Sequence, residues 1–178
     1  MSSRIYPKVW TEFERQADDG RILNFSIEDV PEDMWKSAVE FMLGSYIKED
    51  VWWKTAGTAE DPEAIQEYRV LLTSIIEQKM SLACFLTAPE GAGRTLVGVN
   101  MCMPQDKDRF VEHVPVRTKE LGFKVTGGIF TSDSAQKSAE KADMECLFKI
   151  SYKQFGEQCD IEFDSETEDL KIFGAKVE

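Results

Sequence analysis

Two apolar runs in the middle of the chain, Leu82–Thr87 and Thr95–Met103, flank the short polar stretch Pro89–Arg94. Runs rich in Val, Leu, Phe and Cys and bounded by Pro and Gly are typical of strands joined by a short loop. Both alternating positions are apolar, so both faces of this hairpin should be covered. We therefore predict that the hairpin forms the centre of a mixed sheet.

The connecting residues Gly91-Ala92-Gly93 have the composition of a phosphate-binding glycine loop. Such a loop needs a helix N-terminus directly after it, because the helix presents free N–H groups to the phosphate. A second strand follows here instead, which favours a simple hairpin turn.

Composition limits the remaining possibilities. The 178 residues suit one soluble domain, residues 1–178, and no apolar run is long enough to span a bilayer. The start lacks the apolar core of a signal peptide, so we expect a cytoplasmic protein. The cysteines, Cys84, Cys102, Cys146 and Cys159, form no C-x-x-C pair and are expected to be reduced thiols that hold no metal.

The net charge of −12 argues against nucleic-acid binding, which needs a basic surface. An acidic chain can attract a cationic small molecule, although a solubilising surface explains the same charge more simply.

The residues before the central hairpin predict a first hairpin and two helices. Lys8–Arg15 and Arg21–Ile27 alternate in polarity around an Asp-Gly turn. Asp29 is expected to cap a helix that ends near Lys48, with an apolar stripe that includes Trp35, Met42 and Tyr46. Asp61 and Pro62 are expected to start a helix that runs to about Lys79. Its buried stripe is expected to consist of Ile65, Tyr68, Leu72, Ile75 and Ile76.

The second half of the chain is less regular. Residues 104–138 are polar, broken by Pro and Gly, and predicted to be an irregular insertion in which only Phe123–Phe130 is extended. The insertion holds the single histidine, His113, which we interpret as a loop residue. A helix over Ser134–Phe155 and a strand over Leu170–Val177 should follow.

The segment Glu49–Gly57 carries the clearest chemical signal. Glu49 and Asp50 lie beside Trp52 and Trp53 at the end of a predicted helix. A carboxylate next to aromatic rings loses hydration, and its pKa rises toward neutrality, as a general base for an amine requires. The alternative is a solvated helix end with one tryptophan packed into the core.

Four segments carry a family resemblance: Ile27–Asp33, Tyr46–Asp50, Glu77–Phe85 and Leu96–Asn100. These segments and the order of the predicted elements resemble the GNAT superfamily of N-acetyltransferases, and they are more similar still to its insect arylalkylamine N-acetyltransferase-like branch. The resemblance implies an α/β fold of α+β-like character, with a mostly antiparallel central sheet, flanking helices and Leu170–Val177 as the fourth core strand.

The resemblance implies acetyl transfer from acetyl-CoA to a primary amine. The carboxylate that serves as base through water in this branch falls on Asp50, with Glu49 as the neighbouring alternative, and Trp52 or Trp53 would form an apolar wall for the amine. The residues implied to contact acetyl-CoA are Phe173, Gly174, Ala175, Lys176 and Val177.

The family binds the pyrophosphate with a glycine-rich turn that directly follows the fourth strand. Nothing follows Glu178 in this sequence, so we expect an incomplete GNAT fold that binds acetyl-CoA weakly or not at all. The alternative function is a non-catalytic binding or interaction module. A terminal strand without a neighbour would leave its edge unpaired, and we expect self-association there.

Overall fold

The structure is a computed structural model that describes residues 4–88, 93–104 and 124–176. The chain divides into two compact units. The first comprises residues 2–44 and 67–104, and the second comprises residues 45–66 and 105–178, each within the described ranges.

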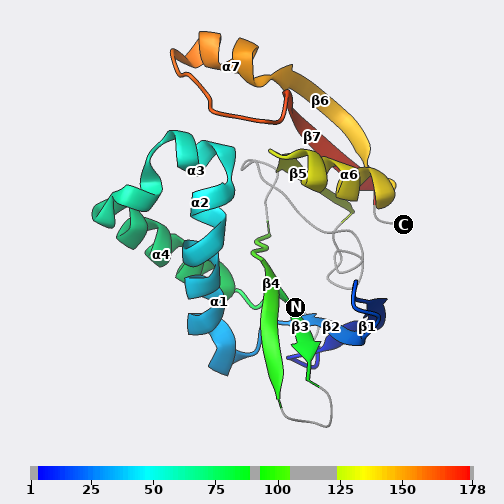
Figure 1. The fold of residues 1–178 in the computed structure, drawn as a ribbon. Coiled ribbons are helices and arrows are strands. Elements are labelled where there is room, and N and C mark those ends of the chain that lie inside the picture. Colours follow the sequence, from blue (N-terminus) through cyan, green and yellow to red (C-terminus); the bar gives the residue numbers. More distant parts are fainter. Residues whose placement is uncertain (1–3, 89–92, 105–123, 177–178) are drawn as a thin grey trace. The chain divides into compact units, whose positions relative to one another are not determined.

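The first unit is built on a four-stranded antiparallel sheet (Figure 1). Its strands, in the spatial order β1-β2-β3-β4, are β1 (Val9–Gln16), β2 (Ile22–Asp29), β3 (Leu82–Thr87) and β4 (Arg94–Asn100). Both predicted hairpins are confirmed, and the 89–92 connection, with its glycine loop, lies outside the described residues.

The predicted central position of the β3–β4 hairpin is wrong. The N-terminal hairpin pairs with β3 through β2. The other strands therefore lie only on the β3 side of the hairpin, and β4 is an edge among the described strands. Burial alternates along β3, with Ala83 and Phe85 buried and their neighbours only partly covered. One face of the hairpin is therefore in the core, whereas we expected both.

The helix after β2 changes its winding midway. It begins with η1 (Glu32–Met34) and α1 (Trp35–Phe41), continues as a π-helical turn, η2 (Met42–Tyr46), and ends with α2 (Ile47–Glu49), close to the predicted end. A π turn holds one more residue than an α turn and rotates the following residues about the axis. Tyr46 is consequently exposed, although the α-helical spacing placed it on the buried stripe, and Ile47 is buried instead.

The start of α4 (Pro62–Ile76) confirms the prediction made from its cap. The Asp61 carboxylate accepts hydrogen bonds from the backbone N–H groups of Glu63 and Ala64, at 2.9 and 3.3 Å. Pro62 occupies the first helical position, where its missing N–H costs nothing. Leu72, Ile75 and Ile76, all on the predicted stripe, are buried.

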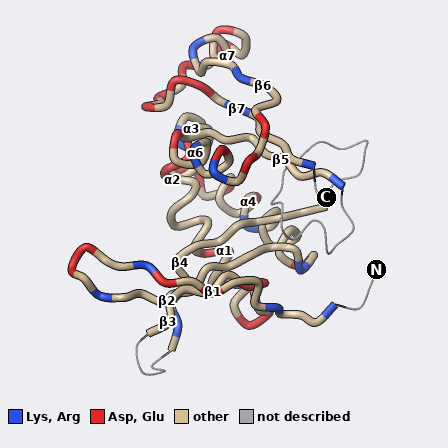
Figure 2. Tube along the Cα trace, turned by 90° about the vertical axis from the view of Figure 1, so that its right-hand side faces the viewer, with Lys and Arg blue, Asp and Glu red and all other residues tan. Residues whose placement is uncertain are grey.

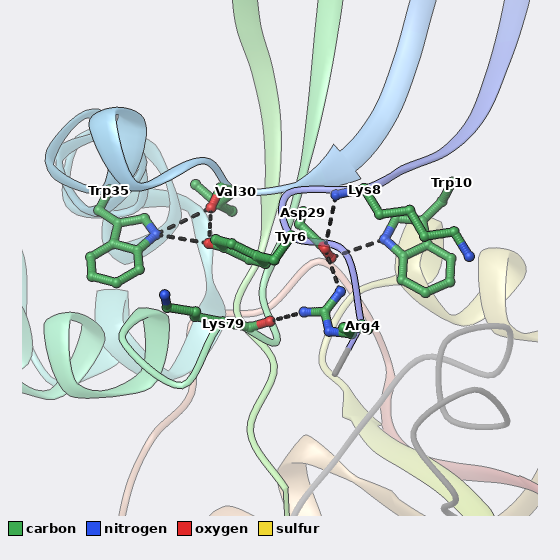
Figure 3. Close-up of polar contacts among 8 residues, drawn as sticks. All are labelled: Arg4, Tyr6, Lys8, Trp10, Asp29, Val30, Trp35 and Lys79. Atoms are coloured by element: carbon green, nitrogen blue, oxygen red, sulfur yellow. Dashed lines mark hydrogen bonds and ion pairs between the residues drawn. The ribbon is translucent and has the colours of Figure 1, made fainter. Parts of the chain in front are cut away.

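Asp29 is not the helix cap that its position suggested. It is the last residue of β2, and its fully buried carboxylate holds the N-terminal segment (Figure 3). It accepts hydrogen bonds from the Lys8 backbone N–H at 3.1 Å and the Trp10 indole N–H at 2.9 Å, and it pairs with the Arg4 guanidinium. A carboxylate removed from water takes the nearest donors, and these lie on β1 and in the segment before it, not in the following helix.

Next to Asp29, the Tyr6 hydroxyl donates to the Val30 carbonyl, and the Trp35 indole N–H lies 3.1 Å from the same oxygen. Lys79 stacks over Tyr6, with its Nζ 5.0 Å from the ring centroid (Figure 3). These contacts join residues before β1 to the ends of β2 and α4.

The second unit contains a three-stranded antiparallel sheet as well as helices (Figure 1). The elements of its C-terminal segment are β5 (Val125–Phe130), α6 (Asp133–Lys141), β6 (Glu145–Ser151), α7 (Tyr152–Cys159) and β7 (Asp169–Lys176). The extended stretch at Phe123–Phe130 is confirmed over β5. The described part of the predicted irregular insertion, residues 124–138, is regular, and His113 lies outside the described residues.

The single helix predicted over Ser134–Phe155 is wrong. Helix α6 stops at Lys141, and Asp143 then takes a left-handed conformation with a φ of 54°. The next residues form β6, whose backbone pairs with β7. Pairing with a strand distant in sequence therefore overrides a locally plausible helical pattern.

Strand β7 also differs from the expectation that it would be an unpaired fourth strand of the central sheet. It lies between β5 and β6 in the order β5-β7-β6, and both of its edges are paired from Lys171 to Gly174. The close packing needs Gly174, because a Cβ there would lie 2.7 Å from the Leu147 side chain. We expected self-association because β7 would have an unpaired edge, and over these residues that edge is paired.

Within the described ranges, no helix is long and apolar enough to cross a membrane. The same residues contain no grouping of three histidine, cysteine, aspartate or glutamate side chains that could hold a metal ion. No disulfide joins the four cysteines.

Replacing Asp29 with alanine should destabilise the first unit by about 3 kcal/mol or more. The change leaves the Trp10 indole and the Arg4 guanidinium without their buried acceptor, which is the costly way to break an ion pair. Urea unfolding followed by fluorescence measures the loss. The control is Asp19→Asn, which removes an exposed ion pair with Arg21 and should change stability far less. Equal losses in both variants would contradict the assigned role of Asp29.

Candidate functional site

Asp50, the predicted base, is a buried N-cap. It links α2 to α3 (Val51–Thr55) in the second unit, and 7% of its surface is exposed. One carboxylate oxygen accepts from the Trp52 backbone N–H at 3.0 Å, and the other accepts from the Thr131 hydroxyl at 2.7 Å. The alternative of a solvated helix end is therefore wrong for Asp50. The neighbouring candidate, Glu49, is exposed at the end of α2.

Tyr152 lies beside this carboxylate. It is the first residue of α7, it is buried, and its hydroxyl donates to the Thr131 carbonyl at 2.9 Å. Burial, followed by the negative charge of Asp50, raises the pKa of the Tyr152 phenol to about 12. Thr131 thus contacts both groups, through its hydroxyl to Asp50 and through its carbonyl to Tyr152.

Aromatic side chains gather around Trp52. Its ring stacks on Phe155 with centroids 5.5 Å apart and lies 6.2 Å from Phe163. Phe163 also contacts Tyr152 at 5.3 Å and Phe155 at 5.7 Å. The other predicted wall, Trp53, is half-buried and belongs to none of these ring pairs.

Two hollows adjoin this cluster. The aromatic pocket has a volume of about 510 Å³, and its lining is Trp52, Thr55, Ala56, Phe155, Cys159, Ile161 and Phe163. The buried Thr55 hydroxyl in its wall has no hydrogen-bond partner among the described residues, so a bound molecule could supply one.

The second hollow, which we call the acidic hollow, has a volume of about 880 Å³. Carboxylates surround it, and its charged lining residues are Lys153, Glu157, Asp160, Glu162 and Glu168. Tyr152, Ile161 and Phe163 also line it. Asp50 lines neither hollow, so any effect of its charge on a bound molecule acts through Tyr152, through water or through space.

The sequence analysis identified Asp50 and Trp52 but missed Thr131, Tyr152, Phe155 and Phe163. One signal could have revealed α7. Ser151 is followed three residues later by Gln154, a helix-start signature, and the Ser151 hydroxyl indeed accepts from the Gln154 backbone N–H at 3.1 Å. No local pattern indicates that Thr131 would reach Asp50, because the two lie 81 positions apart.

The residues implied to contact acetyl-CoA all belong to β7 or follow it. Phe173 and Gly174 pair with strands on both sides, whereas Ala175 and Lys176 pair only with β5. Val177 lies outside the described residues. The cofactor role of these five residues stays a prediction. It assumed that Leu170–Val177 is the fourth strand of the central sheet, whereas β7 belongs to the other sheet.

The described residues do not fit the pyrophosphate of acetyl-CoA. A pyrophosphate needs free backbone N–H groups on a glycine turn that leads into a helix. Gly127 and Gly128 lie inside β5, opposite Gly174 and Phe173. The nearest helix after them, α6, is capped by the Ser132 hydroxyl and has the negative charge of Asp133 in its first turn.

No family model matches the sequence, and no curated protein matches it. The solved structures that share the fold include two from mosquitoes. One is assigned provisionally as arylalkylamine N-acetyltransferase 7 of the yellow fever mosquito, with a TM-score of 0.82, 16% identity, and coverage of 100% of this chain and 98% of that chain. The chain has the fold of the insect N-acetyltransferases. The other is mosquito arylalkylamine N-acetyltransferase-like 5b, with a TM-score of 0.59, 16% identity, and coverage of 86% and 100%.

The N-acetyltransferase fold in this chain is mixed α/β, with antiparallel sheets and flanking helices, as the resemblance implied. At 16% identity the likeness concerns the fold, and the chemistry must be argued from the residues of the site.

The buried phenol of Tyr152 should make stability depend on pH in the alkaline range. An unfolded tyrosine ionises near pH 10, whereas Tyr152 keeps its proton to about pH 12. Between these values the folded state binds a proton that the unfolded state has lost. The free energy of unfolding should therefore be highest below pH 10 and fall as the pH rises.

Urea unfolding between about pH 9 and pH 11 measures this slope, which Tyr152→Phe should reduce. Tyr46→Phe, at an exposed tyrosine, is the control and should leave the slope unchanged. A wild-type slope in Tyr152→Phe would show that the phenol ionises normally.

Proposed function

We propose that this protein is an N-acetyltransferase-type protein that binds a primary arylalkylamine in the aromatic pocket, in a family reaction that uses acetyl-CoA as acyl donor. The observation that carries the proposal is the buried, hydrogen-bonded Asp50 carboxylate behind a cluster of four aromatic rings. The solved structures that share the fold, named as arylalkylamine N-acetyltransferases, support the same class of ligand.

The pocket suits the ring of such an amine. Trp52, Phe155 and Phe163 offer apolar faces for stacking, and a volume of about 510 Å³ lies within the range of small-molecule sites. The positive ammonium end is attracted by the aromatic faces and by the negative charge of Asp50. The ring thus supplies most of the buried apolar area, and the charge sets the orientation.

Asp50 is held firmly for this role. The Trp52 N–H and the Thr131 hydroxyl each bond one of its oxygens, so the carboxylate cannot rotate freely. An amine must lose a proton before it can attack an acyl group, and a fixed carboxylate assists by attracting the cation and accepting the proton through water.

A second function, non-catalytic binding of the amine, is favoured by one specific observation. Gly127 of β5 and Gly174 of β7 lie opposite each other inside the sheet and not in a turn that leads into a helix, which is the arrangement that a pyrophosphate needs. An amine-binding protein that does not catalyse acetylation needs the pocket and Asp50 but not the pyrophosphate site.

The experiment is titration of 2-phenylethylamine by calorimetry, together with an assay of acetyl-CoA-dependent thiol release. Asp50→Asn keeps the size and the capping ability of the side chain and removes its charge. We expect at least a roughly tenfold weaker amine affinity, equivalent to about 1.4 kcal/mol. If the wild type catalyses acetylation, turnover of this variant should fall on the order of 10²–10⁴-fold.

Glu49→Gln is the matched control, because it removes the exposed neighbouring carboxylate and should change little. A large loss in Glu49→Gln alone would move the role to Glu49. Amine binding without thiol release would support the non-catalytic function. No amine binding by the wild type would reject both functions.

A further inference from the structure

The segment between α7 and β7, Asp160–Glu168, combines acidic and apolar residues in strict alternation at its start. Carboxylates occupy positions 160, 162, 164, 166 and 168, and the apolar residues are Ile161 and Phe163. Residues 161–168 have no helix or strand (Figure 1), and Figure 2 shows acidic residues along the segment. We call this segment the acidic strap.

The acidic strap separates the two hollows of the site. Ile161 and Phe163 line both the aromatic pocket and the acidic hollow. Phe163 is also the ring that contacts Trp52, Tyr152 and Phe155. Moving Phe163 would therefore connect the acidic hollow to the aromatic pocket.

Both ends of the strap are anchored to backbone. The Ile161 N–H donates to the Gly156 carbonyl at 3.0 Å, and the Glu168 carbonyl accepts from the Tyr152 N–H at the same distance. The strap lies so close to α7 at its first anchor that a Cβ at Gly156 would meet the Ile161 carbonyl oxygen at 2.3 Å. The ends can therefore stay in place while the middle moves.

The middle of the strap is held by weaker contacts. The Asp164 carboxylate pairs with Lys54 Nζ at 2.7 Å, and their side chains are 82% and 52% exposed. Exposed ion pairs contribute little and are screened by salt. The Phe163 ring packs against α3 and α7, and the Thr167 hydroxyl, near the second anchor, accepts a hydrogen bond from the Asp133 backbone N–H at 3.2 Å.

We propose that the acidic strap is a gate to the aromatic pocket. The Phe163 ring closes the pocket, and the Lys54–Asp164 ion pair, which we call the latch, holds the strap in place. A cation collects in the acidic hollow and enters the pocket when the latch opens and the Phe163 ring withdraws. The identity of the cation, an arylalkylamine, rests on the proposed function. The motion of the strap does not depend on that identity.

The charges of the strap favour this route. A hollow lined by carboxylates raises the local concentration of a cation and speeds its association. The aromatic pocket supplies the apolar surface on which the ring of the amine is finally bound. The acidic hollow thus attracts the cation from a distance, and the aromatic pocket binds its ring by direct contact. The strap lies between these two steps.

The latch is tested first, without any ligand, by hydrogen exchange of the backbone amides in residues 160–168 of the full chain. Asp164→Asn should speed exchange about two- to fivefold, the factor expected for loss of an exposed ion pair. Glu166→Gln is the matched control, because it removes one negative charge from the same strap without removing the latch. Added salt should bring the wild type toward Asp164→Asn.

The gate is tested next by stopped-flow fluorescence with 2-phenylethylamine. Asp164→Asn should speed both association and dissociation several-fold with little change in affinity, since the latch does not contact the ligand. Phe163→Ala should also speed both steps and, in addition, weaken affinity through lost packing. Glu166→Gln should only slow association slightly, through the lost charge.

Equal hydrogen exchange in Asp164→Asn and Glu166→Gln would overturn the latch, and wild-type amine rates in Phe163→Ala would overturn the gate. If the wild type binds no amine, the proposed function fails, and the strap is judged by hydrogen exchange alone. Faster exchange confined to Asp164→Asn would then still support a hinged strap over the pocket.

Discussion

A carboxylate that leaves water must find hydrogen-bond donors, and this constraint organises both units of the molecule. In the first unit the donors to Asp29 come from Arg4, Lys8 and Trp10, so the segment before the first strand is drawn onto the sheet. In the second unit the donors to Asp50 come from α3 and from Thr131, the residue directly after β5. Each buried aspartate thereby joins segments that are distant in sequence, and its removal would expose the joined segments to water.

The two aspartates have different partners, and the partners decide whether the charge of each carboxylate is neutralised. Asp29 is paired with a guanidinium, so its charge is neutralised where it lies. The donors to Asp50 are an amide and a hydroxyl, which satisfy its oxygens but carry no charge. Its negative charge therefore acts on the surrounding aromatic cluster, where little water screens it. On the proposed function, an ammonium ion bound against Trp52 and Phe155 would interact with this charge through Tyr152, through water or through space.

The position of β7 matters most for the acetyl-donor side of the site. Close pairing on both sides, with Gly174 against Leu147 and opposite Gly127, makes the strand a structural centre of its sheet. Backbone groups engaged in two ladders cannot also hold a ligand. On the proposed function, the described residues form the amine site more completely than the cofactor site, which favours the non-catalytic alternative.

Local patterns in the sequence determined the first hairpin, the start and stripe of α4, and the approximate end of the helix before Asp50, because caps, turns and periodic burial depend on neighbours a few positions apart. The pairing of an acidic helix end with tryptophan was also visible in the sequence. Only the tertiary structure decided that Asp29 holds Arg4 and Trp10, that β6 interrupts a predicted helix, and that Thr131, Tyr152 and Phe163 gather around Asp50 and Trp52. The reason is physical: strand pairing and burial of polar groups are settled by the free energy of contacts between distant segments, and a local pattern of residues does not encode which distant partner a segment will meet.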